Sequence, residues 1–319
     1  MAEKKEPVVE QIENYGLSQK DRPKTMFSKI GIVGCGTTGQ ILTREIAAKG
    51  IEVVFLELSD DIVKHSIQEI SAELDNMIGR WGMTSGEKRA ILSRIKGTTT
   101  YKDFADCDLV MEAILSKRRE TSIEVRKEVF KKIEENVTRE AIIATHTSTL
   151  VITELASELK YKDRCINLHL PTQIQDSNTL EIARSLYTSD EVFKNVKKFA
   201  ALLGKNSIQV EESPGLISTR LFVSLINEAC SMLMEGVGSK EDVDLMVRDG
   251  IGMPLGPFEM ADKIGLDRVI RWMENLYNEF GDHHYMPSPL LKRLVRAHHY
   301  GRKTGEGFYK YDENGKKMK

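Results

Sequence analysis

The sequence predicts an α/β fold in which a doubly wound sheet is followed by an all-α C-terminal domain. Short apolar runs alternate with amphipathic stretches from residue 29 to about residue 210. After Ser213-Pro214-Gly215, long helical segments follow, and no strand pattern returns until GFYKY near the end. We therefore expect an N-terminal tail (1–26), a sheet-containing domain (27–211) and a helical domain (212–319). The tail is rich in Lys, Glu, Gln and Asp and has only a faint apolar pattern.

A glycine-rich turn joins the first predicted strand to the first predicted helix. The segment 29–39 reads KIGIVGCGTTG, an apolar run followed by the spacing G-x-G-x-x-G. Gly34 permits the tight turn, Gly36 lets the backbone approach a pyrophosphate, and Gly39 lets the helix pack closely on the sheet. Free N–H groups at the helix N-terminus favour an anion there. The residues of this turn are therefore predicted to bind a dinucleotide: Gly34, Gly36, Thr37, Thr38 and Gly39.

The second predicted strand, EVVFLE at 52–57, ends in a carboxylate. Glu57 lies about 20 residues beyond the glycines, where a carboxylate accepts hydrogen bonds from the adenosine ribose. No Lys or Arg follows within the next few residues, so the pattern favours NAD over NADP and predicts a Rossmann-type domain. The alternative is a glycine turn in an ordinary α/β protein, with Glu57 as a solvated strand end.

The later elements follow in order along the chain. The amphipathic stretch 62–94 predicts a helical hairpin inserted after the second strand. Further strands are predicted at DLVMEA, AIIATH, CINLHL and SIQVEE. One long apolar helix is predicted at 216–235, and helical segments continue to about residue 296. So much apolar helix surface predicts a homodimer formed through the C-terminal domain.

Composition argues against several functional classes. The net charge is −2 and the pI is near 6.4, which gives no general reason to expect nucleic-acid or membrane binding. No apolar run reaches the length of a membrane span and the N-terminus has no apolar signal core, so we expect a cytoplasmic protein. The four cysteines are scattered without a CxxC pair, which predicts buried free thiols and no metal site.

Three side chains are candidates for chemistry at the edge of the predicted sheet. His169 ends the strand CINLHL, Ser148 follows the strand AIIATH, and Glu181 begins the segment EIAR after an irregular connection. An imidazole is a good base for a hydroxyl proton, and a carboxylate on its other nitrogen fixes the tautomer. The set suits alcohol oxidation. The alternatives are a structural histidine, a serine that caps the helix beginning near Thr149, and a surface carboxylate.

From about residue 29 to the C-terminus, these residues resemble the L-3-hydroxyacyl-CoA dehydrogenases, which include bacterial 3-hydroxybutyryl-CoA dehydrogenases. The resemblance rests on the His169 segment and on the motifs VGCGTTG, DLVMEAI, IIATHTSTLVITELA, SPGLISTRLFVSLINEA, GMPLGPFEMADKIGLD and GRKTGEGFYKY. The resemblance implies fatty acid metabolism and an acyl-CoA substrate. His169 would take the proton of the 3-hydroxyl during hydride transfer to NAD, Glu181 would orient His169, and Ser148 would hydrogen-bond the substrate oxygen.

Several positions depart from the family's pattern. The family's H-F-F-N-P is here HLPTQ, with Thr172 in place of the amide; a second Asn is Thr219, and the Asn of S-N-T-S-S is His146. After Ala113, Ser116 stands where the family has a second Glu beside the ribose. The resemblance adds Ala113, Ser116, Thr172 and Lys303 as cofactor-binding candidates, and Thr172 and Thr219 as substrate-binding candidates beside Ser148. The positive charges of Arg80 and Lys117 make these two residues candidates for binding the phosphates of CoA.

Alternatives remain for the basic residues and for the function. Lys117 could belong to a solvated basic helix start, and Lys303 could lie in a motif that only anchors the C-terminus. The first functional hypothesis is an NAD-dependent dehydrogenase of short-chain L-3-hydroxyacyl-CoA. The second keeps the hydride chemistry on a free 3-hydroxy acid, because the departures lie where the substrate should be. The third is an NAD-binding scaffold without turnover.

Overall fold

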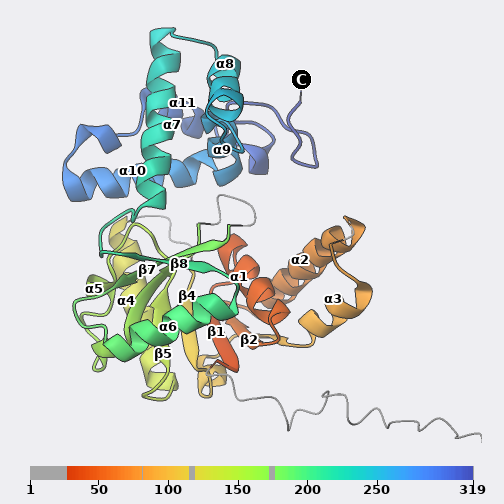
Figure 1. The fold of residues 1–319 in the computed structure, drawn as a ribbon, viewed down its shortest axis with the longest axis vertical. Helices are drawn as coiled ribbons and strands as arrows, with labels where there is room; N and C mark the ends of the chain where they lie inside the picture. The colour runs from red at the N-terminus through yellow and green to blue at the C-terminus, as the bar shows by residue number, and fades with distance from the viewer. Residues whose placement is uncertain (1–26, 81, 115–118, 172–176, 319) are drawn as a thin grey trace, which may run out of the picture.

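The computed structural model describes residues 27–80, 82–114, 119–171 and 177–318. The predicted N-terminal tail and the candidates Ser116, Lys117 and Thr172 lie outside the described residues. Within them, one eight-stranded sheet has the order β3-β2-β1-β4-β5-β6-β7-β8 (Figure 1). The strands are β1 (Lys29–Val33), β2 (Glu52–Leu56), β3 (Ile95–Thr98), β4 (Leu109–Glu112), β5 (Ile142–Thr145), β6 (Cys165–His169), β7 (Thr179–Arg184) and β8 (Asn206–Val210).

The sheet is wound in both directions from β1, and neighbouring strands are parallel except β6 and β7, which pair antiparallel. Helices cover both faces, because side chains of successive strand residues point to opposite sides. Leu42 of α1 (Thr37–Ala48) and Phe199 of α6 (Asp190–Leu202) pack on one face. Phe130 of α4 (Arg119–Asn136) and Leu155 of α5 (Ile152–Leu155) pack on the other. This confirms the predicted Rossmann-type α/β class.

A helical hairpin, α2 (Asp60–Gly79) and α3 (Ser85–Leu92), follows β2 as predicted. Beyond β8 the described chain is helical: α7 (Ser218–Glu235), α8 (Lys240–Leu245), α9 (Pro257–Ile264), α10 (Leu266–Phe280) and α11 (Pro289–Arg296) pack around a second core. The predicted domain boundary near residue 211 falls in the segment between β8 and α7. Figure 1 shows these helices standing over one end of the sheet.

Two strands were not predicted, and both carry polar residues that hide their pattern. Only Thr98 is buried in β3, so the strand IKGT lacks an apolar alternation. The segment EIAR, expected to follow an irregular connection, belongs to β7, and Glu181 is the third residue of that strand. A buried carboxylate interrupts what would otherwise read as an apolar strand.

The motif GRKTGEGFYKY forms isolated bridges instead of a strand, and it wraps around a buried carboxylate. Asp262 accepts hydrogen bonds from the backbone N–H groups of Phe308 and Tyr309 and from the Tyr311 hydroxyl, each at 2.9 Å. Burial raises the pKa of Asp262 to about 6 despite these donors. A Cβ on Gly307 would lie 2.0 Å from Asp262 Oδ1, so this position of the motif has no room for a side chain.

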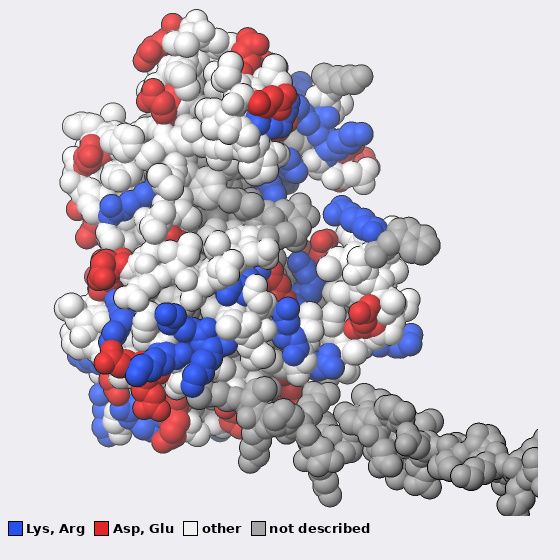
Figure 2. Space-filling model, viewed as in Figure 1, with Lys and Arg blue, Asp and Glu red and all other residues white. Residues whose placement is uncertain are grey.

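Charges of both signs are interspersed over the face drawn in Figure 2, with Lys and Arg gathered over α6. That helix carries Lys194, Lys197 and Lys198, all of which are exposed. All four cysteines are buried and free. Among the described residues, no group of His, Cys, Asp and Glu is arranged to hold a metal ion.

Candidate active site

The centre of the candidate site is a buried histidine–carboxylate pair on adjacent strands. His169, the last residue of β6, lies directly opposite Glu181 of β7 in the antiparallel register. Directly opposed residues place their side chains on the same face of a sheet. His169 Nδ1 lies 2.7 Å from Glu181 Oε2, and both residues are almost fully buried. The antiparallel β7 is therefore what delivers the carboxylate to the imidazole.

Glu181 is also bound by the N-terminus of α7. Its Oε1 accepts the backbone N–H groups of Ile217 and Ser218, each at 2.9 Å. Its Oε2 accepts the Ser218 hydroxyl at 2.6 Å. Burial raises the pKa of Glu181, but the hydrogen bonds from His169 and Ser218 outweigh burial and leave the pKa below its ordinary value. The N-terminal end of a helix dipole adds to this preference for negative charge.

An ionised Glu181 determines the tautomer of His169. A carboxylate without a proton can only accept, so His169 Nδ1 carries the hydrogen, as assigned from this hydrogen-bond network. The lone pair of the imidazole is then on Nε2. His169 is thereby prepared to accept a proton on the side away from Glu181. Ser218, which the sequence did not single out, completes this arrangement; its only signal was a hydroxyl at the start of a long apolar helix.

Ser148 lies beside the first turn of α7. Thr219 Oγ1 donates to Ser148 Oγ at 2.9 Å, and both residues are buried. Because Ser148 Oγ accepts this bond, its own proton is available to another oxygen. Ser148 does not cap α5, which begins at Ile152 and has Val151 as its N-cap. The helix-capping alternative is therefore wrong. Thr219 contacts the serine instead of supplying an amide at this position.

His146 places a second imidazole beside the first. Its ring centroid lies 5.1 Å from that of His169. Its Nε2 lies 3.1 Å from the carbonyl oxygen and 3.2 Å from the backbone nitrogen of Leu170. Burial, and then the neighbouring His169, lower the pKa of His146 well below its ordinary value. A neutral imidazole therefore stands where the family's pattern has an amide.

The glycine turn has the shape that a pyrophosphate requires. Gly34 has φ +93°, and a Cβ on Gly39 would lie 2.1 Å from the Gly34 carbonyl oxygen. Gly36 differs, because a Cβ there would meet nothing within 4 Å. Gly36 is the N-cap of α1 without a side-chain cap, so the space beside it adjoins free backbone donors. Glu57 Oε1 accepts the Cys35 N–H at 2.5 Å, which places the carboxylate against this turn.

This contrast predicts opposite results for two alanine variants. Gly39→Ala forces a side chain into backbone, so we expect roughly 3 kcal/mol or more of lost stability, measured by urea unfolding. Gly36→Ala leaves the protein's own packing intact, so its stability should stay within about 0.5 kcal/mol of wild type. Its Cβ occupies the space beside the free N–H groups, and NADH affinity, measured by fluorescence, should fall by about tenfold. Equal losses of stability in the two variants would contradict this assignment.

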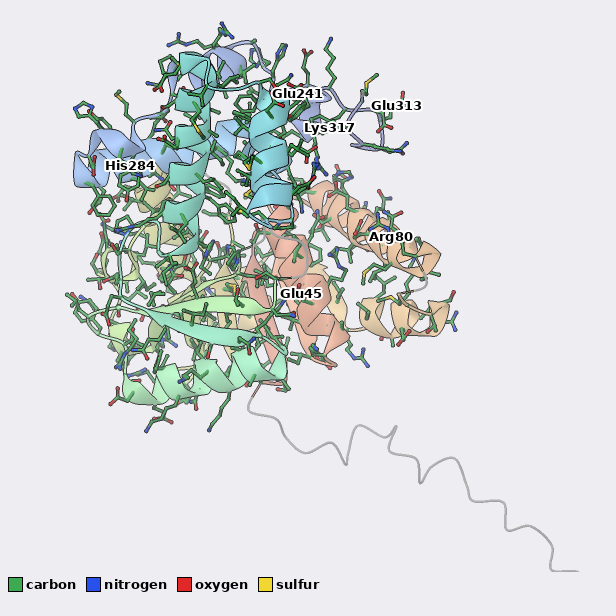
Figure 3. All side chains as sticks on the ribbon, turned by 45° about the horizontal axis from the view of Figure 1, so that its top comes forward. Glu45, Arg80, Glu241, His284, Glu313 and Lys317 are labelled. Carbon is green, nitrogen blue, oxygen red and sulfur yellow. The ribbon has the colours of Figure 1, made fainter. Side chains whose placement is uncertain are left out.

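The remaining sequence candidates lie apart from His169 or at its margin. The Ala113 N–H donates to Val33 at 2.9 Å, next to the glycine turn. Arg80 is exposed at the end of α2, on the hairpin (Figure 3). Lys303 Nζ contacts Asp267 Oδ1 at 2.6 Å and is about half exposed. The structure brings neither Arg80 nor Lys303 to the imidazole.

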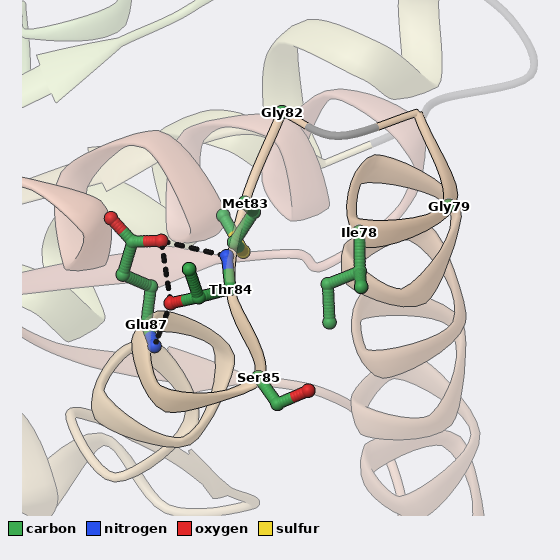
Figure 4. Close-up of a pocket in the computed structure, with 7 residues that line it drawn as sticks. All are labelled: Ile78, Gly79, Gly82, Met83, Thr84, Ser85 and Glu87. Carbon is green, nitrogen blue, oxygen red and sulfur yellow. Dashed lines mark hydrogen bonds between the residues drawn. The ribbon is translucent and has the colours of Figure 1, made fainter.

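A pocket of about 630 Å³ lies at the tip of the α2–α3 hairpin (Figure 4). Thr84 and Glu87 form a capping box there, in which the Thr84 hydroxyl accepts the Glu87 N–H and the Glu87 carboxylate accepts the Thr84 N–H. The residues that line this pocket lie on both sides of Arg80 in the sequence, and the His169–Glu181 pair is not among them. Its lining residues are Ile78, Gly79, Gly82, Met83, Thr84, Ser85 and Glu87.

Comparison with known proteins identifies the family. Residues 29–213 match the 3-hydroxyacyl-CoA dehydrogenase NAD binding domain, and residues 215–311 match the C-terminal domain of the same family. The chain is 34% identical over 285 residues to the 3-hydroxybutyryl-CoA dehydrogenase of Clostridioides difficile, covering 89% of this chain and all of the relative. It is 35% identical over 283 residues to the probable 3-hydroxybutyryl-CoA dehydrogenase of Deinococcus radiodurans, with coverage of 89% and 100%.

Solved structures agree with this. The (S)-3-hydroxybutyryl-CoA dehydrogenase from Ralstonia eutropha is 36% identical with a TM-score of 0.79, covering 90% of this chain and all of that one. FadB2 of M. tuberculosis is 29% identical with a TM-score of 0.85, covering 90% and 99%. No helix in the described part of the chain has the length and apolarity needed to cross a bilayer. The chain belongs to the 3-hydroxyacyl-CoA dehydrogenase family of NAD-dependent oxidoreductases.

Proposed function

We propose that the protein transfers hydride between NAD and C3 of a short-chain L-3-hydroxyacyl-CoA, with His169 as the general base. The observation that carries this proposal is the buried His169–Glu181 pair with Ser148 held nearby by Thr219. The curated relatives at about 35% identity are 3-hydroxybutyryl-CoA dehydrogenases, which supports a short acyl chain.

In the oxidative direction, His169 Nε2 takes the proton of the substrate's 3-hydroxyl. Glu181 stabilises the imidazolium that forms, because its carboxylate already accepts the Nδ1 hydrogen. Ser148 keeps its proton and donates a hydrogen bond to the same substrate oxygen, which orients that oxygen. Bound NAD supplies the hydride acceptor. In the reverse direction, His169 returns the proton as C3 is reduced.

NAD is proposed to bind along the carboxyl ends of β1, β2 and β4. The turn Gly34 to Gly39 and the N-terminus of α1 would hold the pyrophosphate, with Thr37 and Thr38 in the first turn. Glu57 would accept the ribose hydroxyls, and it has no basic neighbour in sequence to attract a 2′-phosphate. Ala113 borders this turn. Ser116, Thr172 and Lys303 stay cofactor-binding predictions.

CoA is proposed to extend toward the α2–α3 hairpin. The exposed guanidinium of Arg80, at the end of α2, offers a positive charge for its phosphates. Lys88 is a weaker candidate, because its Nζ is paired with Asp75 at 2.6 Å. Lys117 stays a prediction.

A homodimer through the helical domain and a cytoplasmic location complete the proposal. Large apolar side chains on α7 and the segments after it are exposed, among them Leu221, Val237, Met246 and Ile251, each more than 60% accessible. Such a surface supports burial against a second copy.

The first test is NADH oxidation at 340 nm with acetoacetyl-CoA, run beside free acetoacetate and a small panel of 3-keto acids. We expect turnover of the thioester. Activity on a free acid alone would favour the second candidate, a dehydrogenase of free 3-hydroxy acids. That candidate is supported by His146 and Thr219, which replace two amides of the family's pattern. Absence of turnover on every 3-keto compound would contradict both.

A further inference from the structure

One face of α10 lies against the candidate active site. Asn275 Nδ2 donates to Thr149 Oγ1 at 2.8 Å, and Thr149 adjoins Ser148. Arg268 precedes Asn275 by seven residues, or two helical turns, so both side chains project from the same face of α10. Figure 1 shows α10 in the part of the helical region that lies next to the sheet-containing part. On this face, Arg268 lies two turns before the contact of Asn275 with Thr149.

Arg268 is a partly buried cation without a carboxylate partner among the described residues. The adjacent Asp267 is instead contacted by Lys303 at 2.6 Å and by Arg271 at 3.5 Å. Buried charges are usually paired, because removing an ion from water without compensation is costly. A guanidinium that makes no ion pair is suited to bind an anion.

The charge of Arg268 reaches His146, the imidazole that lies beside His169. Burial, and then the charge of Arg271, lower the pKa of Arg268, and Asp267 only partly opposes them. The charge of Arg268 in turn contributes to the lowered pKa of His146, whose ring lies 5.1 Å from that of His169. Together with the contact that Asn275 makes from the same face of α10, this places the charge of Arg268 on the side of the helix that faces His146.

We propose that Arg268 is a specificity residue that binds a carboxylate carried by the substrate. The planar guanidinium matches a carboxylate with two parallel hydrogen bonds. The inference rests on the proposed dehydrogenase function and narrows its substrate class. The carboxylate has two sources: C1 of a free 3-keto acid, or the far end of an acyl chain attached to CoA.

The test compares Arg268→Gln with the control Arg271→Gln, whose arginine lies one turn away and is paired with Asp267. Two matched substrate pairs are used with NADH: 3-oxoadipyl-CoA against 3-oxohexanoyl-CoA, and acetoacetate against acetoacetyl-CoA. We expect the wild type to prefer the carboxylate-bearing member of one pair by about tenfold or more in kcat/KM. That pair identifies the source of the carboxylate. Arg268→Gln should abolish the preference through about a 10- to 100-fold rise in KM, while Arg271→Gln retains it.

Three outcomes would overturn the proposal: no preference within either pair, an equal loss on both members in Arg268→Gln, or a raised KM for NADH with the preference intact. The last would assign Arg268 to the cofactor. Calorimetric binding of adipyl-CoA and hexanoyl-CoA tests the anion site without turnover. If no 3-keto compound is reduced but adipyl-CoA binds through Arg268, the proposed reaction fails and the carboxylate site stands.

Discussion

Replacing His169 with Gln is expected to lower kcat for 3-ketoacyl-CoA reduction by roughly 10³-fold, within the range that general bases and acids contribute. The Gln amide can donate to Glu181 as the imidazole does at 2.7 Å. It has no group that exchanges a proton at neutral pH. The buried pair is therefore kept satisfied while the proton transfer is lost, which a steady-state assay with acetoacetyl-CoA measures.

Binding serves as the control for this variant. NADH affinity should stay within about twofold of wild type, because the glycine turn and Glu57 lie at other strand ends of the sheet. The melting temperature should change by only a few degrees, since a hydrogen bond to Glu181 is retained. Turnover within tenfold of wild type would show that another group carries the proton.

Glu181→Gln is expected to lower kcat by a similar factor, through the tautomer of His169. The amide oxygen can still accept the N–H groups of Ile217 and Ser218 that now contact Oε1 at 2.9 Å. The amide nitrogen then replaces Oε2 and donates to His169 Nδ1, which moves the imidazole hydrogen to Nε2. An Nε2 that carries a hydrogen cannot take the substrate's proton.

The pH dependence of stability separates this variant from a general packing defect. The pKa of Glu181 is lowered in the folded protein, so its carboxylate adds stability above its unfolded pKa, near 4.5, and that stability is lost as pH falls through the folded value. Glu181→Gln removes this contribution, so its free energy of unfolding should fall less than that of wild type on acidification. Urea unfolding over a range of pH measures this difference. An equal loss of unfolding free energy in both proteins on acidification would contradict an ionised Glu181.

The sequence was sufficient for the Rossmann-type sheet, because the glycine turn and the apolar strands follow local rules of turn geometry and burial. The strand β7 was missed, because the carboxylate of Glu181 is buried there by partners that are distant in sequence, His169 and Ser218. The role of Ser218 could not be read from its neighbours for the same reason.

The departures from the family's pattern show the same limit. Thr219 was recognised as a substitution, but its contact with Ser148 is made across 71 residues of chain and follows only from the docking of α7. Arg268 is a single cation in a charged stretch, and the sequence contains no sign that its neighbour Asp267 is bound to Lys303 instead. Pairing of charges depends on tertiary geometry, which local propensity does not determine.

The contact of α7 with Glu181 means that the candidate site is built from both the sheet and the helical region. The imidazole and its carboxylate belong to the sheet, whereas the donors that fix the carboxylate, from Ile217 and Ser218, belong to the first turn of a helix beyond it. Any motion that withdraws this turn would leave the base present but unaligned. In the proposed mechanism, proton transfer therefore requires the first turn of α7 to be docked against the sheet.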